Sequence, residues 1–160
     1  MRRTETRGKT KDGRALPWLW GILLGVMAFS GFGQLPIFKR YYISDIPGLA
    51  WSADFYLTHR IHYVGAIVLL GLAGYVAFDY LLGNRRHVRL TGSGFVRLCL
   101  LAGIVITGVF RVLKNLPDVV FSPGFTLVVD ISHLGFMMAY LFAALAFLIM
   151  GRGWVEQKSF

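Results

Sequence analysis

Cysteine is almost missing from this chain of 160 residues, because Cys99 is the only one and it lies inside an apolar stretch. The chain alone therefore cannot build a disulfide framework or a cluster held by several thiolates. The sequence also has no glycine-rich phosphate loop, no set of nucleophile, base and acid, and no zinc-ligand spacing. We interpret Cys99 as a small packing residue, and we find no domain for the chemistry of a primary substrate.

Charged residues are scarce and unevenly spread. They make up 16% of the chain, against 56% apolar residues, and the mean hydropathy is +0.59. They cluster in short segments that flank long apolar runs, which is typical of a membrane protein. The formal net charge of +9 would otherwise suggest nucleic acid as a partner. Since the basic residues form no amphipathic stripe, we expect no nucleic-acid binding.

Four apolar segments are long enough to cross a bilayer, which takes about 20 residues of helix. They cover residues 17–38, 54–82, 94–112 and 125–150. Backbone polar groups must be satisfied within the segment in lipid, so these segments are expected to be helices. The sequence predicts an all-α fold, a four-helix transmembrane bundle made of two helical hairpins. Residues 1–16 are expected to form a basic tail, residues 17–150 the membrane domain and residues 151–160 a C-terminal tail.

The distribution of Lys and Arg predicts the direction of the spans. Twelve of the 17 lie in the two tails, in the middle connection or just inside the third span, and five lie on the opposite side. The richer side is expected to be cytoplasmic, so both termini should face the cytoplasm. No convincing cleavage site follows the basic tail, and we expect an uncleaved first span with Pro17 in its first turn. The predicted location is a bacterial inner membrane, crossed several times.

The two halves of the sequence resemble each other. The matching pieces are Ser30-Gly31 with Thr107-Gly108, Pro47-Gly48 with Pro123-Gly124, and His62-Tyr63-Val64-Gly65 with His133-Leu134-Gly135. Each half is therefore expected to contain a helix, an outer connection and a returning helix that carries a histidine.

His62 and His133 are the candidate metal ligands. Ionisable residues inside a membrane span are costly and usually functional, and neutral imidazole is a common iron ligand. Measured from the inner helix ends at Gly83 and Gly151, their depths differ by three residues, or about 4.5 Å, which helix tilt can absorb. His59 lies one turn further out, with a mismatch of about 9 Å. We therefore predict that His62 and His133 hold one haem b iron near the outer face.

Small and basic residues near the two histidines support this prediction. Gly31 and Gly108 leave helix surfaces without side chains, which a flat porphyrin needs for close approach. A cationic rim lies slightly further out and is expected to hold anionic propionates. Its members are Lys39, Arg40, Arg60, Arg111 and Lys114. Asp130 is either a residue near a helix N-terminus, favoured by the helix dipole, or a proton acceptor in quinol chemistry.

Plain membrane packing is the competing interpretation of the same residues. Small residues are common packing devices in membrane helices, and Lys and Arg at the interface are ordinary anchors. A histidine in a span often only hydrogen-bonds to a neighbour, and a pocket that binds a quinone alone also stays open. The outer aromatic residues form either an interfacial belt or a docking surface for an extrinsic subunit. They are Tyr41, Tyr42, Trp51, Phe55 and Tyr56.

This pattern of spans and histidines resembles the cytochrome b561-like superfamily, and most of all the cytochrome b subunits of quinone-linked oxidoreductases of the formate dehydrogenase gamma type. The resemblance covers residues 17–150 and rests on four short pieces. They are Ser30-Gly31, Thr58-His59-Arg60-Ile61-His62-Tyr63-Val64-Gly65, Thr107-Gly108 and Ser132-His133-Leu134-Gly135. In that family one haem near the outer face lies between the second and fourth helices, at positions that His62 and His133 match. The family's second haem needs a histidine in the first helix, which has none here, so we predict one haem only.

The resemblance implies an electron-transfer subunit that is not catalytic alone. It would exchange electrons between the quinone pool, such as menaquinone, and an outer-face partner with iron–sulfur clusters or several c-type haems, within membrane lipid. The predicted cofactor-binding residues are His62, His133, Gly31, Gly108, His59, Arg60, Arg111 and Lys114. The alternative is a haem-free membrane anchor that binds a quinone in a respiratory complex. A small transporter or channel and a purely structural assembly subunit are further hypotheses.

Overall fold

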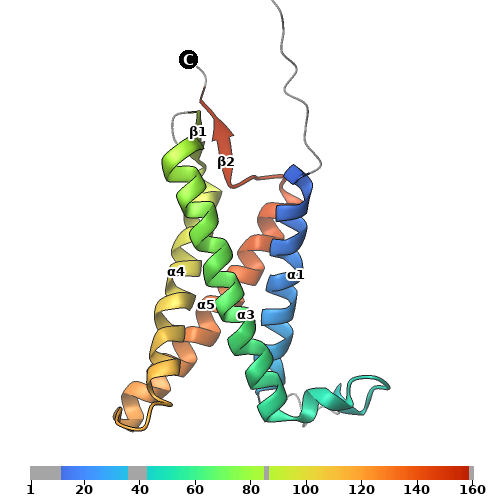
Figure 1. Ribbon diagram of the computed structural model, residues 1–160, viewed down its shortest axis with the longest axis vertical. Coiled ribbons are helices and arrows are strands. Elements are labelled where there is room, and N and C mark those ends of the chain that lie inside the picture. Colours follow the sequence, from blue (N-terminus) through green and yellow to red (C-terminus); the bar gives the residue numbers. More distant parts are fainter. Residues whose placement is uncertain (1–11, 36–42, 85–86, 159–160) are drawn as a thin grey trace, which may run out of the picture. The chain divides into compact units, whose positions relative to one another are not determined.

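The computed structural model describes residues 12–35, 43–84 and 87–158. Figure 1 shows the long helices that dominate them. They are α1 (Asp12–Gly33), α3 (Phe55–Asp79), α4 (Gly92–Leu113) and α5 (Pro123–Ile149). The shorter elements are 3-10 helices at Ile43–Asp45 and Ala50–Ala53, a π-helical segment at Tyr80–Asn84, and strands β1 (Val88–Leu90) and β2 (Val155–Gln157). The predicted all-α class is confirmed.

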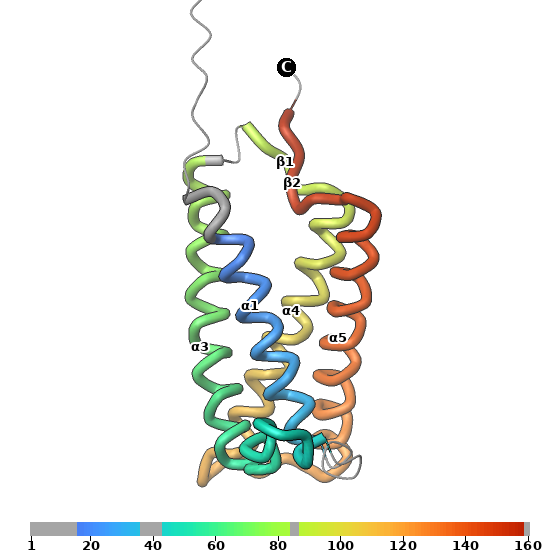
Figure 2. The backbone as a smooth tube through the Cα atoms, turned by 90° about the vertical axis from the view of Figure 1, so that its right-hand side faces the viewer, coloured from blue at the N-terminus to red at the C-terminus, as the bar shows by residue number. Residues whose placement is uncertain are grey.

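The chain divides into two compact units, residues 1–80 and 81–160. In the first, α1 packs against α3, and we call this pair hairpin 1. In the second, α4 packs against α5, which we call hairpin 2. Figures 1 and 2 show each pair side by side. The two hairpins predicted from the repeat are thus present, and the boundary between the units lies inside the stretch 17–150.

Side-chain caps explain where three of the helices begin. The Asp54 carboxylate accepts hydrogen bonds from the backbone N–H groups of Tyr56 and Leu57, at 2.9 and 3.1 Å, and starts α3. The Thr91 hydroxyl caps α4 in the same way. Ser122 caps α5, with Pro123 in its first turn, where a missing N–H costs nothing.

The first helix differs from its predicted extent. It begins at Asp12 and ends at Gly33, so Pro17 lies inside the helix and not in its first turn. The prediction for Pro17 was wrong because the helix extends back into the charged segment that precedes the apolar run. The remaining predicted boundaries differ from the observed ones by a few residues.

Gly151 ends α5, as its place after the last apolar run predicts. Its φ of 65° lies in the left-handed region, which glycine adopts without a steric penalty. The Gly151 N–H donates to the Leu148 carbonyl at 3.1 Å, and the Arg152 N–H donates to the Phe147 carbonyl at 2.8 Å. This pair of bonds is a Schellman motif, which satisfies the last carbonyl groups of a helix.

Four helices among the described residues are long and apolar enough to cross a membrane. The spans cover Leu16–Gly33, Phe55–Gly83, Gly92–Leu113 and Pro123–Ile149. Large apolar side chains on these helices are exposed, including Ile67, Phe78 and Leu148, each by more than 65%. Lipid is the medium that solvates such a surface, so the chain is a multi-pass membrane protein.

The short strands were not predicted from the sequence. Strand β1 pairs with β2 in an antiparallel register that places Val88 opposite Gln157 and Leu90 opposite Val155. Nearby, the buried Arg97 donates a hydrogen bond to the Arg152 carbonyl at 2.6 Å. Its guanidinium carbon also lies 4.7 Å from the centre of the Trp154 ring. The segment after α5 is therefore fastened to the start of α4.

Candidate functional site

In hairpin 1, the His62 ring of α3 faces the end of α1. Its Nδ1 lies 3.0 Å from the Ser30 hydroxyl oxygen, a hydrogen-bond distance. Ser30 is almost fully buried, at 1% exposure, and His62 is half-buried. A Cβ atom added at Gly31 would lie 3.3 Å from Cε1 of the same ring. Glycine at position 31 therefore makes room for the imidazole.

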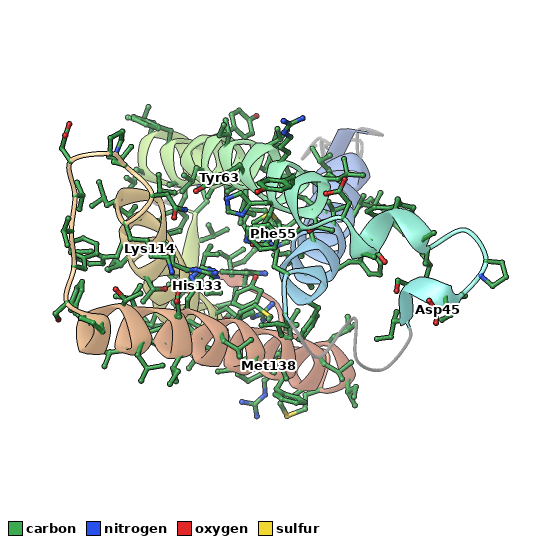
Figure 3. All side chains as sticks on the ribbon, turned by 90° about the horizontal axis from the view of Figure 1, so that it is seen from below. Asp45, Phe55, Tyr63, Lys114, His133 and Met138 are labelled. Carbon is green, nitrogen blue, oxygen red and sulfur yellow. The ribbon has the colours of Figure 1, made fainter. Side chains whose placement is uncertain are left out.

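Hairpin 2 repeats this arrangement with different residues. Nδ1 of His133 on α5 lies 3.0 Å from the Thr107 hydroxyl oxygen on α4. Thr107 is buried, and a Cβ atom at Gly108 would lie 3.4 Å from Cε1 of His133. Figure 3 labels His133 where its ring lies toward α4. Each hairpin thus has a hydroxyl–glycine pair on its first helix and a histidine against it on its second. We call these two sets the histidine–hydroxyl pairs.

The two predicted glycines have a structural reason that the sequence did not show. Their contact is with the histidine rings, which they allow to approach the neighbouring helix backbone closely. Since Nδ1 of each ring bonds to a hydroxyl group, an iron bond would fall to the other ring nitrogen, Nε2. The approach of Gly31 and Gly108 to a porphyrin stays a prediction.

One helical turn from each histidine–hydroxyl pair lies a second pair, and here the hairpins differ. In hairpin 1 the Gln34 side-chain oxygen lies 3.1 Å from Nδ1 of His59. In hairpin 2 the Asp130 carboxylate forms ion pairs with Arg111, at 3.1 Å, and with Lys114, at 2.8 Å. The spacing is the same, because Gln34 and Arg111 each follow the hydroxyl residue by four positions. A neutral pair in hairpin 1 thus corresponds to a charged cluster in hairpin 2.

Asp130 does not lie at the N-terminus of its helix. It is in the third turn of α5, where the helix dipole has little effect, and the Ser122 side chain caps the helix. The dipole interpretation was therefore wrong. The Asp130 carboxylate is held by two cations, with Lys114 contacting both of its oxygens at 2.8 Å. Figure 3 shows Lys114 and His133 in the same region between α4 and α5.

His59 lies between aromatic rings on its own helix. The Phe55 ring stacks on it, with centres 5.4 Å apart and planes at 16°, and the Tyr63 ring meets it edge-on at 4.4 Å. Figure 3 labels Phe55 and Tyr63 on α3. Arg60, the neighbour of His59, is exposed. Of the predicted rim, Arg111 and Lys114 lie together at the end of α4, while Lys39 and Arg40 lie outside the described residues, as do Tyr41 and Tyr42.

Two matches in the predicted repeat do not hold in the structure. Gly48 has a left-handed φ of 87° in a loop, whereas Pro123 starts α5 and Gly124 continues it. A Cβ at Gly65 would lie 2.5 Å from the sulfur of Met27, whereas nothing lies within 4 Å of one at Gly135. At these glycine positions the two halves are therefore similar in sequence only.

The partners of the histidines were not identified from the sequence. The repeat matches Ser30 with Thr107, but it does not show that their hydroxyl groups contact the histidines. Gln34 is not part of any predicted site. A signal for them exists in the spacing, since Ser30 and Gln34 lie four apart on one helix while His59 and His62 lie three apart on the next. Positions three or four apart share one face of a helix, so two such pairs can meet across a hairpin.

The described residues bring together no group of three or more His, Cys, Asp and Glu side chains that could hold a metal ion alone. A porphyrin supplies four nitrogen ligands itself, so two histidines suffice for haem iron. His62 and His133 belong to different units, and their meeting across one iron stays a prediction. Comparisons with family models, curated proteins and solved structures found no match to this chain.

Proposed function

We propose that this chain is a membrane cytochrome b subunit that carries electrons between the quinone pool and an extrinsic redox partner. One haem b near the outer face would be ligated by His62 and His133. The observation that carries the proposal is that the histidine–hydroxyl pair occurs once in each hairpin, with both hydroxyl oxygens 3.0 Å from Nδ1. His62 and His133 would each supply one imidazole to hold the haem iron.

The hydroxyl group beside each histidine supports ligation more than packing alone. A ligating histidine usually donates its other ring N–H to a neighbouring acceptor, which fixes the orientation of the ring and raises its basicity. Ser30 and Thr107 provide this neighbour for His62 and His133. Nδ1 of His59 lies instead 3.1 Å from the side-chain amide oxygen of Gln34. The hydrogen-bond pattern therefore favours His62 over His59 as the ligand in hairpin 1.

Charge at the end of hairpin 2 supports an anionic ligand nearby. Arg111 and Lys114 share the single carboxylate of Asp130, so the cluster keeps one net positive charge. The side chains are only 23–37% exposed, which limits screening by water. A carboxylate such as a haem propionate would complete the neutralisation of this cluster.

The proposed role divides the chemistry between cofactor and chain. When bound, haem supplies an iron that changes its charge by one electron. The residues of the chain would hold the two imidazoles through Ser30 and Thr107, and Arg111, Lys114 and Asp130 would supply charge near the haem. Quinone, as a membrane-soluble carrier, fits a chain whose spans lie in lipid, and an iron–sulfur or multihaem c-type partner on the outer face would continue the path.

The test is a measurement of haem in the purified chain. We expect a reduced-minus-oxidised spectrum of low-spin haem b and about one haem per chain by pyridine haemochrome assay. His62→Ala and His133→Ala should each remove the low-spin spectrum, because each removes one axial ligand. His59→Ala is one matched control, and His87→Ala, in the connection just before β1 and outside the spans, is the other. Both should retain the low-spin spectrum. A wild-type chain without haem, purified from haem-replete cells, would contradict the proposal and favour the haem-free anchor.

A further inference from the structure

The Thr107 hydroxyl has one proton and three neighbours that compete for it. Its oxygen lies 2.7 Å from the Gly103 carbonyl oxygen, 3.1 Å from the Ile104 carbonyl oxygen and 3.0 Å from Nδ1 of His133. The nearest of the three is the Gly103 carbonyl, which can only accept a hydrogen bond, and we assign the hydroxyl proton to it. Toward His133, the Thr107 oxygen can then offer only a lone pair.

This assignment fixes the position of the proton on His133. A neutral imidazole has one N–H, and Nδ1 must carry it in order to donate to the Thr107 oxygen. The free lone pair of the ring is then on Nε2. This is the nitrogen that binds a metal when Nδ1 donates a hydrogen bond to a neighbouring group. In free histidine the hydrogen usually lies on the other nitrogen, so the hydroxyl selects the less common tautomer.

Hairpin 1 differs at this point. The Ser30 hydroxyl oxygen lies 3.3 Å from the Met27 carbonyl oxygen and 3.0 Å from Nδ1 of His62, so the imidazole is its nearer partner. The Gln34 amide nitrogen donates to the Ser30 carbonyl at 3.1 Å, which turns its oxygen toward His59. The assignment made for Thr107 therefore does not extend to Ser30.

We infer that Thr107 is a positioning residue that holds His133 in the tautomer with hydrogen on Nδ1 and thereby presents Nε2 for ligation. This inference rests on the proposed function for the meaning of that tautomer, but the tautomer itself is a property of the chain. Thr107 alone has this role, since its hydroxyl is bound to a carbonyl at 2.7 Å, nearer than the histidine ring.

The experiment compares Thr107→Val with Thr107→Ser in the full chain. Valine keeps the shape of threonine and removes the hydroxyl, whereas serine restores it. Thr58→Val is the matched control, because the Thr58 hydroxyl also lies 3.0 Å from two backbone carbonyl oxygens, those of Asp54 and Phe55, whereas the Thr107 hydroxyl lies near two carbonyl oxygens and a histidine. The ¹⁵N NMR spectrum of histidine-labelled protein reports which ring nitrogen carries hydrogen, with or without haem.

We expect wild type, Thr107→Ser and Thr58→Val to show His133 with hydrogen on Nδ1, and Thr107→Val to lose that preference. Where haem is bound, Thr107→Val should also weaken its retention about tenfold and raise the midpoint potential, since the imidazole becomes a weaker donor to the oxidised iron. An unchanged His133 tautomer in Thr107→Val overturns this inference. A wild-type chain with the Nδ1 tautomer and no haem overturns the proposed function and leaves the tautomer assignment standing.

Discussion

Hairpins 1 and 2 hold a histidine in the same way, yet they differ one helical turn away. Both have a hydroxyl oxygen 3.0 Å from Nδ1 of the ring and a glycine against Cε1. Beyond that point hairpin 1 has a neutral Gln34–His59 pair, and hairpin 2 has a carboxylate between two cations. The shared part is what the proposed iron ligation would require, and the part that differs is where the hairpins differ in charged side chains.

The hairpins also differ in how they fill the space between their helices. In hairpin 1 the large residue Met27 lies on the first helix and meets Gly65 on the second. In hairpin 2 the large residue is Phe136 on the second helix, and it meets Gly103 on the first. Close packing is thus kept while the large and small partners change helices. Two hairpins with the same arrangement of helices can therefore place the large and the small residue on opposite helices. This explains why the sequence repeat is short and gapped.

The largest effect is expected from filling the space that both hairpins share. Gly31→Leu or Gly108→Leu should displace the histidine ring, since even a Cβ atom would lie 3.3 or 3.4 Å from Cε1. We expect haem retention to fall by at least about tenfold in each. Gly135→Leu is the control, because nothing lies within 4 Å of its Cβ position, and it should retain haem. Equal haem content in all three variants would show that the glycines serve another purpose.

A second large effect is expected from the contacts of Arg97, which attach the segment after α5 to the start of α4. Arg97→Ala removes a hydrogen bond of 2.6 Å to the Arg152 carbonyl and ring contacts with Phe147 and Trp154. The free energy of unfolding should fall by about 2–3 kcal/mol, since hydrogen bonds to charged groups contribute about 1.5–3 kcal/mol. The exposed Arg89–Glu156 ion pair supplies the control.

Arg89→Ala should change the stability by less than about 1 kcal/mol, as is usual for an exposed ion pair. Denaturant unfolding in detergent measures both variants. If Arg97→Ala proved as mild as Arg89→Ala, the segment after α5 would not be fastened by the Arg97 side chain.

An intermediate effect is expected from the exchanged packing partners. A Cβ atom at Gly103 would lie 2.8 Å from the Phe136 ring, which is rigid, so Gly103→Ala should cost about 1–2 kcal/mol. At Gly65 the obstacle is the flexible end of Met27, and Gly65→Ala should be near neutral because alanine favours the helix by about 1 kcal/mol. Thermal unfolding compares them, and Phe136→Leu should partly rescue Gly103→Ala. A larger loss in Gly65→Ala would contradict the packing comparison.

The smallest change in stability is expected from the charged cluster that only hairpin 2 has at this position. Asp130→Asn removes the carboxylate between Arg111 and Lys114, which are partly exposed, so the stability should change by less than about 1 kcal/mol. The midpoint potential of the haem should rise, because loss of a negative charge favours the reduced iron. Redox titration checks the direction, with Gln34→Ala in hairpin 1 as the uncharged control. An unchanged potential in Asp130→Asn would place the cluster away from the iron.

Sequence patterns predicted the helices well because a membrane span has a simple requirement of length and hydropathy. The end of α5 at Gly151 followed from the need for a left-handed residue there. The start of α1 could not be predicted in this way, because no capping residue directly before Pro17 marks a helix start there. The strands at Val88 and Val155 were missed because three-residue strands pair across a long separation and have no local signature.

The site was predictable only in part for a similar reason. His62, His133, Gly31 and Gly108 stand out as polar or small residues in apolar spans. The contacts of Thr107 and Gln34 depend on how two helices face each other, which residue spacing alone leaves undetermined. The dipole interpretation of Asp130 could be rejected only when the structure placed this residue in the third turn of α5, beside Arg111 and Lys114.

The most direct test of the account is an imidazole rescue of each proposed ligand in turn. His62→Gly and His133→Gly should each convert the six-coordinate low-spin haem spectrum to a five-coordinate one, and added imidazole should restore it in both. That result would require one iron bound by one residue from each hairpin. A low-spin spectrum that survives either substitution without imidazole would contradict the claim that these two histidines share a haem.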